Sequence, residues 1–121
     1  MQTMEPAAQR HPFPKAEKLC GKRDIGRLIA GGRWGGHGCL RFCCLSPNGL
    51  DHSRLLVSVP KKFFKRAVKR NLLKRRIREA WRLEPDLAGC DILFSYNSSE
   101  IRSSAQIRAD VAYILDEIRS R

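Results

Sequence analysis

One stretch, KRAVKRNLLKRRIREAWR from Lys65 to Arg82, limits more than any other what this chain can fold into. Its apolar residues recur at helical spacing, about 100° apart per residue, and share one stripe of a helix. The members of that stripe are Leu73, Ile77, Ala80 and Trp81. Pro85 follows and helps to end the helix. We therefore expect a helix over residues 64–83 that packs this stripe, Trp81 included, against a core and leaves its cations outside.

The same stretch carries most of the charge of the chain. Residues 61–82 hold eleven Lys and Arg residues and a single acid, Glu79, and so account for +10 of the net charge of +12. Like charges four residues apart on a helix repel by a few tenths of a kcal/mol per pair. A helix that keeps this repulsion is suited to an anion lying across it. Nucleic-acid phosphates meet the need, because Arg binds them in a planar fork and Lys as a point charge.

Length and composition bound the class of protein. A chain of 121 residues suits one compact domain. No run approaches the roughly 20 apolar residues of a membrane span, and the polar N-terminus has no apolar signal region. We therefore expect a cytoplasmic protein with no membrane partner. The five cysteines form no paired framework, so reduced thiols are expected.

The remaining pattern predicts a small mixed domain. Residues 1–12 are interpreted as a disordered leader and residues 13–121 as the domain. Helices are expected over 18–30 and 103–118, strands over 39–45, 54–59 and 91–96, and a fourth strand near 33–38. The first helix should pack Leu19, Ile25, Leu28 and Ile29. Strands 39–45 and 54–59 should pair as an antiparallel hairpin, with Cys39, Arg41 and Cys43 on one face of the first strand.

A thiol or metal site is the weakest interpretation. His37, Cys39, Cys43 and Cys44 lie close in sequence, but Cys39 and Cys43 on one strand face would be about 13 Å apart, too far to share one tetrahedral ion. No spacing suggests a Ser-His-Asp or Cys-His arrangement. We expect no metal bound by the protein and no catalytic residue in it.

The residues from Lys61 to Glu79 resemble the signature of the protein subunit of bacterial ribonuclease P. That family has a helix of the form A-V-x-R-N-R-x-x-K-R-x-x-R-E, preceded by a strand ending in Lys-Lys. The matching positions here are Lys61-Lys62, Ala67-Val68, Arg70-Asn71, Lys74-Arg75 and Arg78-Glu79. Leu72 departs from the pattern, since the family has a second Arg there.

The resemblance implies an α+β fold: a single small domain with a central four-stranded, mostly antiparallel sheet, three helices and a left-handed βαβ crossover through the basic helix. It implies a ribonucleoprotein whose catalytic RNA, using Mg²⁺, removes the 5′ leader of precursor tRNA, while the protein binds both RNAs. The residues expected to bind the catalytic RNA are Lys61, Lys62, Arg66, Arg70, Asn71, Lys74, Arg75 and Arg78. The residues expected to line a leader-binding cleft are Phe13, Lys15, Ile25 and Ile29. Glu79 is expected to orient neighbouring Arg side chains.

A rival interpretation comes from another class of protein. A basic ribosomal or nucleic-acid-packaging protein would need the same charge and no role in catalysis. Stimulation of precursor-tRNA cleavage by a catalytic RNA distinguishes the two.

Overall fold

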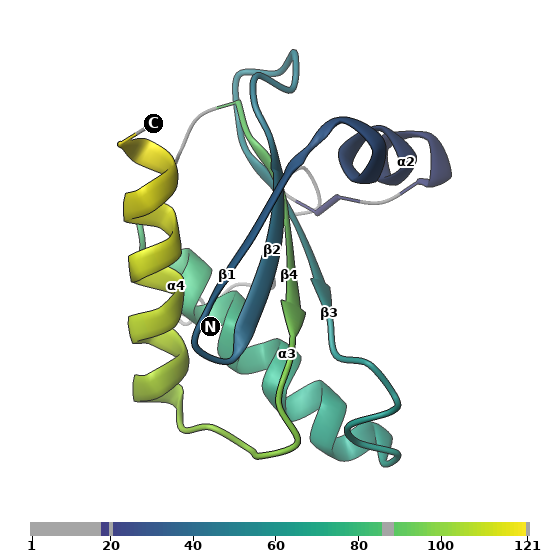
Figure 1. The fold of residues 1–121 in the computed structure, drawn as a ribbon, viewed down its shortest axis with the longest axis vertical. Coiled ribbons are helices and arrows are strands. Elements are labelled where there is room, and N and C mark those ends of the chain that lie inside the picture. The colour runs from purple at the N-terminus through teal and green to yellow at the C-terminus, as the bar shows by residue number, and fades with distance from the viewer. Residues whose placement is uncertain (1–17, 20, 86–88, 121) are drawn as a thin grey trace, which may run out of the picture.

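A computed structural model describes residues 18–19, 21–85 and 89–120. The elements in chain order are α2 (Lys22–Gly31), β1 (Arg33–His37), β2 (Leu40–Leu45), β3 (Arg54–Ser58), α3 (Ala67–Arg82), β4 (Asp91–Tyr96) and α4 (Ser104–Arg119). Figure 1 shows one twisted sheet with the helices around it. The leader expected over residues 1–12, together with Phe13 and Lys15, lies outside the described residues.

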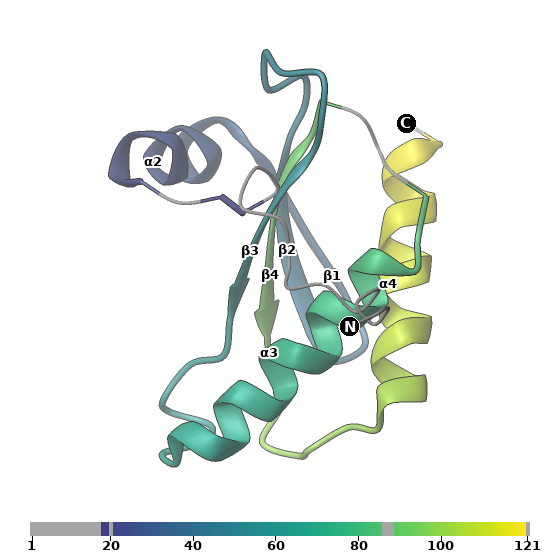
Figure 2. The ribbon, with the colours of Figure 1, turned by 180° about the vertical axis from the view of Figure 1, so that it is seen from behind.

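The four strands form one sheet in the order β1-β2-β4-β3. β1 with β2 and β2 with β4 are antiparallel, whereas β3 and β4 are parallel. The chain therefore crosses over from β3 to β4 through α3. Seen with α3 in front of the sheet, this crossover is left-handed (Figure 2). The expected α+β class, the four strands and the crossover are confirmed.

The predicted hairpin between residues 39–45 and 54–59 is wrong. β4 lies between β2 and β3, and β2 instead forms its hairpin with β1. The physical reason is burial: five of the six residues of β4 are buried, which suits a central strand covered on both faces, whereas β3 alternates and β1 is mostly exposed. The β2–β3 connection is tied to β4, because the Asn48 side-chain amide donates to Asp91 Oδ1 at 2.8 Å.

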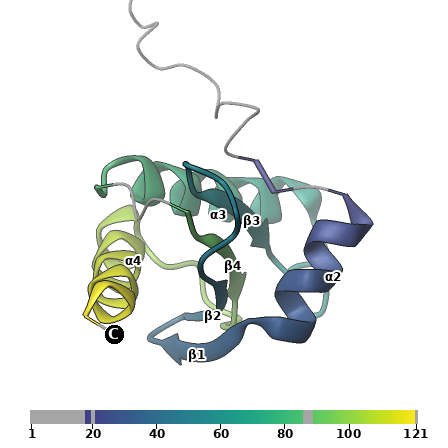
Figure 3. The ribbon, with the colours of Figure 1, turned by 90° about the horizontal axis from the view of Figure 1, so that it is seen from above.

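The sheet has a core on each face. On one face, α3 and α4 pack against the sheet, and the predicted stripe of α3 is buried there. Trp81 is 8% exposed and meets Phe94 edge-on, with ring centroids 6.4 Å apart, so its expected core position is confirmed. The other face has a smaller core under α2, formed by Leu19, Leu28, Cys43 and Leu93. Figure 3 shows α2 and α4 at opposite sides of the sheet.

The first helix begins later than predicted. Gly21 has φ 97°, outside the helical region, and α2 starts at Lys22 rather than at residue 18. Lys18 instead forms an isolated parallel bridge with Leu55. Leu28 is fully buried and Ile25 packs partly on the core, but Ile29 is 48% exposed and lies outside the packed side.

Cys39 does not share a strand face with Cys43. β2 begins at Leu40, because the chain turns through Gly38 at φ 60°. Cys39 joins the core under α3 and α4, whereas Cys43 joins the core under α2.

Candidate nucleic-acid interface

α3 is fixed on the sheet by its apolar residues. Leu73 and Ile77 are fully buried and Ala80 and Trp81 nearly so, all on one side of the helix. A buried side chain of this size contributes about 1.5–3 kcal/mol. The charged residues of α3 are therefore held in place before any ligand arrives, which lowers the entropy lost on binding.

Most of the predicted RNA-binding residues share the outside of α3 and the turn before it. Lys61, Lys62, Arg66, Asn71 and Arg75 are exposed, and Lys74 and Arg78 are partly exposed. We call these seven residues the α3 cationic surface. Within the part of the chain that the structure describes, none of the seven side chains forms an ion pair or a hydrogen bond. Lys62 lies over the Phe63 ring, with Nζ 5.1 Å from the centroid. These cations are therefore available to phosphates.

Arg70 is held differently from its neighbours. Its Nη1 donates to the carbonyl oxygens of Phe64 and Lys65, at 2.8 and 2.7 Å. The N-cap residue Arg66 makes no side-chain cap bond, so this guanidinium secures the turn that leads into the helix. Arg70 therefore has a structural role beside its predicted contact with RNA.

Two further arginines of α3 have partners in the protein. Arg82 Nη2 donates to Glu79 Oε1 at 3.0 Å, so the expected role of Glu79 in orienting an arginine is seen at Arg82. Arg76 Nη1 donates to the carbonyl oxygen of Arg102 and ties α3 to the start of α4. Leu72, which replaces the family's second Arg, is partly buried.

The expected leader side lies on the opposite face, where α2 is held by an ion-pair network. Arg54 Nε and Nη2 donate to the two carboxylate oxygens of Asp91 at 2.9 and 2.7 Å. Arg54 Nη1 also donates to Asp24 of α2 at 3.1 Å. The hydrogen bond with Asp91 raises the pKa of Arg54, which keeps the guanidinium charged. Through this network the sheet positions the helix that carries Ile25 and Ile29.

Sequence reasoning missed four residues that belong near these surfaces. Lys65 and Lys69 are exposed beside the α3 cationic surface, and their charge was the available signal. Trp34 and Arg41 are exposed on the sheet face that α2 partly covers. The signal for Trp34 was a large aromatic residue in an otherwise small and polar strand, RWGGH.

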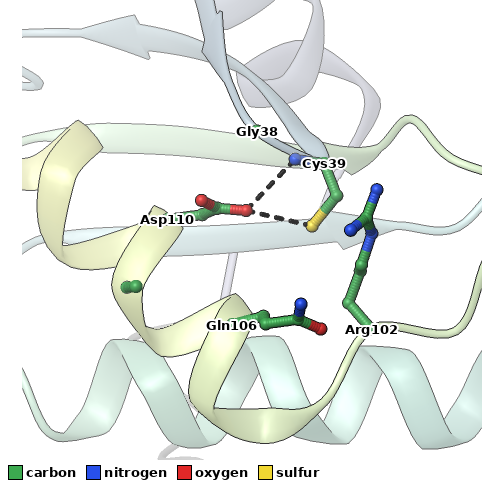
Figure 4. A pocket seen from close by; sticks show the side chains of 6 residues that line it. Gly38, Cys39, Arg102, Gln106 and Asp110 are labelled. Atoms are coloured by element: carbon green, nitrogen blue, oxygen red, sulfur yellow. Dashed lines mark hydrogen bonds between the residues drawn. The ribbon is translucent and has the colours of Figure 1, made fainter.

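The cluster of His37 and the cysteines is dispersed by the fold. Cys43 Sγ donates to the carbonyl oxygen of Leu28 at 3.3 Å, and Cys44 Sγ lies 2.8 Å from Cys90 Sγ. Cys39 lines a pocket of about 240 Å³ beside α4, where its N–H and S–H donate to Asp110 Oδ2 at 3.1 and 3.2 Å (Figure 4). Burial, helped by Asp110, raises the pKa of Cys39 to about 12. The thiol stays protonated, which does not suit a nucleophile.

Among residues 18–19, 21–85 and 89–120, no three His, Cys, Asp or Glu side chains are grouped so that they could hold a metal ion. Of the described helices, none combines the length and the apolar character needed to cross a bilayer.

Comparison with known proteins agrees with this geometry. The family model described as Ribonuclease P matches residues 13–119. The "Ribonuclease P protein component" of Marinobacter nauticus is 36% identical over 81 residues, which cover 67% of this chain and 61% of the relative. That of Ralstonia pickettii is 41% identical over 86 residues, which cover 69% of this chain and 59% of the relative. The matched segment thus spans about three fifths of these relatives.

Solved structures show the same fold. The RNase P protein of Staphylococcus aureus superposes with a TM-score of 0.76 at 25% identity, covering 86% of this chain and 96% of that one. The RNase P protein from Thermotoga maritima superposes with a TM-score of 0.72 at 28% identity, covering 84% and 96%. The similarity therefore includes the α3 crossover and the sheet together.

Proposed function

The chain belongs to the ribonuclease P family, and from this membership we propose that it is the RNA-binding protein subunit of a ribonuclease P ribonucleoprotein. In this role it assists the endonucleolytic removal of the 5′ leader from precursor tRNA, and the RNA subunit carries out the catalytic step. Membership of the family supports the part of the proposal that concerns an endoribonuclease complex. The division of labour between protein and RNA is our proposal.

The observation that carries the proposal is the α3 cationic surface. Its seven residues are exposed or partly exposed and without ionic partners among the described residues. They lie on α3 and in the turn that leads into it, and Leu73, Ile77 and Trp81 anchor that helix. Rigid, unneutralised cations bind phosphates with little loss of entropy and release condensed counterions. Binding of the catalytic RNA through this surface should therefore weaken steeply as salt rises.

The leader is assigned to the other side of the sheet. Ile29 is exposed on α2, while Ile25 is partly committed to the core, so Ile29 is the better placed of the two to contact RNA. The roles of Phe13 and Lys15 remain proposals from the resemblance. The same resemblance places Mg²⁺ in the RNA, and we propose no ligand for it in the protein. We also propose that the holoenzyme works in the cytoplasm.

Reconstitution tests the proposal directly. Purified protein is added to ribonuclease P RNA at low magnesium concentration, and cleavage of precursor tRNA is followed. We expect stimulation by the protein and no cleavage by the protein without RNA. Absence of stimulation, with tight RNA binding retained, would favour the packaging alternative. Cleavage without the RNA would overturn the cofactor role.

A further inference from the structure

Trp34 is an exposed aromatic residue near the start of an edge strand. It is 49% exposed, whereas the other tryptophan of the chain, Trp81, is 8% exposed in the core. Tryptophan combines a large apolar area with little conformational freedom, and an exposed indole often marks a place where something binds. In β1 it has no packing role that would account for its size, because the strand is otherwise mostly exposed.

The register of the sheet determines what surrounds Trp34. Trp34 is paired with Cys43, so its side chain lies on the face that α2 partly covers. Arg41 shares that face, and its guanidinium carbon lies 5.9 Å from the centre of the indole ring. Ser95 is paired with Arg41, and Ser58 with Ser95. We call these four residues, Trp34, Arg41, Ser58 and Ser95, the open sheet face.

The hairpin that carries Trp34 is held at both sides. A Cβ on Gly35 would come within 2.7 Å of the Phe42 ring, so Phe42 packs directly against the backbone next to Trp34. At the end of the strand, His37 stacks on Tyr113 of α4, with ring centroids 3.7 Å apart. The indole is thus presented by a backbone that other contacts have already ordered.

This arrangement has the chemistry of a site for one unpaired nucleotide. A base stacks on an indole regardless of its identity, and stacking of this kind is a common way to bind single-stranded nucleic acid. A guanidinium beside the ring supplies the phosphate contact, and hydroxyl groups supply sugar or phosphate contacts. A protein partner would find here one aromatic residue among a cation and small polar side chains, a surface of less apolar character than the centre of a typical interface.

We propose that Trp34 and Arg41 bind one unpaired nucleotide of single-stranded RNA, with the base stacked on Trp34 and its phosphate bound by Arg41. The proposal rests on the proposed function, because it takes the 5′ leader of precursor tRNA as that strand. It assigns the stacking role to the β1–β2 hairpin instead of to α2, whose Ile25 and Ile29 have no aromatic ring. The open sheet face and the α3 cationic surface lie on opposite faces of the sheet, so the two can be occupied at once.

The fluorescence of Trp34 tests the contact itself. The Trp81→Phe variant, once shown to fold, keeps Trp34 as its single tryptophan. We assemble it with ribonuclease P RNA and titrate it with precursor tRNA carrying a long single-stranded leader, or with the same tRNA lacking a leader. Quenching by the first and not by the second supports the proposal. An identical response to both overturns it.

Affinity measurements on the holoenzyme separate stacking from structure. Trp34→Ala should weaken binding of the long-leader substrate roughly tenfold, the effect of losing one stacked base, without weakening binding of the leaderless tRNA. Trp34→Phe should restore most of the loss, and Arg41→Gln should give a smaller loss that vanishes at high salt. Ile101→Ala, which removes an apolar side chain of similar exposure (42%) outside the hairpin, is the control and should leave the leader effect intact. Equal losses on both substrates would show a structural role and overturn the proposal.

Failure of the two proposals would look different. If the protein is not a ribonuclease P subunit, the unaltered chain will not stimulate cleavage of either substrate. If only the proposal for Trp34 is wrong, the unaltered chain will stimulate cleavage and bind the long-leader substrate more tightly. The Trp34→Ala protein will then show the same stimulation and the same preference. A peptide or protein partner at the open sheet face would also give a Trp34→Ala protein with an unchanged leader preference.

Discussion

α3 and α2 lie on opposite faces of one sheet and are held there by different forces. α3 buries Leu73, Ile77, Ala80 and Trp81, whereas α2 buries only Leu28 and is bound to the sheet through Asp24 and the buried pair of Arg54 and Asp91. Apolar packing is insensitive to the loss of one charge, but a buried ion pair is not. The surface proposed for the large RNA therefore rests on the more robust support, and the leader side on one that a single substitution can break.

The largest effect is expected from Arg54→Ala. Asp91 is only 3% exposed and would lose both hydrogen bonds from the guanidinium, leaving a buried carboxylate without its cation. Breaking a buried pair from one side costs about 3–5 kcal/mol. Urea unfolding should show this loss, while Arg27→Ala, which removes a surface ion pair with the same Asp24, should cost less than about 1 kcal/mol. Similar stabilities for the two variants would show that the network does not support the fold.

The next largest effect concerns the α3 cationic surface. Changing Lys74 and Arg78 to Glu should weaken binding of ribonuclease P RNA about a hundredfold, because two phosphate contacts become repulsive, and should reduce the slope of log affinity against log salt by about two. Filter binding over a salt series measures both. The control changes Arg23 and Arg108 to Glu, with the same change in net charge on α2 and α4. If the two double variants lose equal affinity, general charge and not α3 attracts the RNA.

A smaller and more local effect is expected from Asp24→Asn. It weakens the bond between α2 and Arg54 but leaves the Arg54–Asp91 pair in place. Loss of a half-exposed charge contact costs about 1 kcal/mol, so amides of α2 should exchange with solvent about five times faster. Amides of α3 should keep their rates. Equal acceleration in both helices would mean that the two faces of the sheet open together, which would remove the distinction between them. Asp24→Glu should restore most of the protection.

Local patterns in the sequence predicted the elements that depend on near neighbours. The strand over residues 91–96 was placed at its observed bounds, and the helix expected over residues 103–118 matches α4 to within one residue at each end. The stripe of α3 was also identified correctly, because a 3.6-residue period encodes which side is buried. These predictions needed no knowledge of the strand order.

Features that depend on distant residues were not accessible in the same way. The false hairpin arose because sequence proximity favoured pairing of neighbouring strands, whereas the burial of β4 decided its central position. The pairing of Arg70 with two carbonyl oxygens is likewise invisible in a charge count. Trp34 was not singled out, because its exposure on the same sheet face as Arg41 becomes visible only with the sheet register.

The smallest effect is expected from alkaline pH, and it acts on the β1–β2 turn. Burial, helped by Asp110, raises the pKa of Cys39 from 9.0 to about 12, so the folded state holds the neutral thiol while the unfolded chain ionises near pH 9. Its contribution to stability is complete below pH 9 and declines as pH rises toward 12. Linkage over the full shift would lower the free energy of unfolding by about 1.4 kcal/mol between pH 8 and pH 10. Solvent screening at this turn should reduce the measured fall to about half of that.

Cys39→Ser, which keeps a donor for Asp110 but does not ionise in this range, should reduce that decline. It should not abolish it, since burial also raises the pKa of Cys43. Urea unfolding at successive pH values measures the slope, and an unchanged slope in Cys39→Ser would exclude this group. Cys39 ties the turn after β1 to α4. Because alkaline pH weakens this tie, hydrogen exchange of the β1 amides should accelerate at a lower pH than that of the α3 amides. The hairpin that presents Trp34 would then depend on the hydrogen bonds of Cys39 to the Asp110 carboxylate, just as α2 depends on the bond of its Asp24 carboxylate to Arg54. Of these three elements, only α3 would be held mainly by apolar packing.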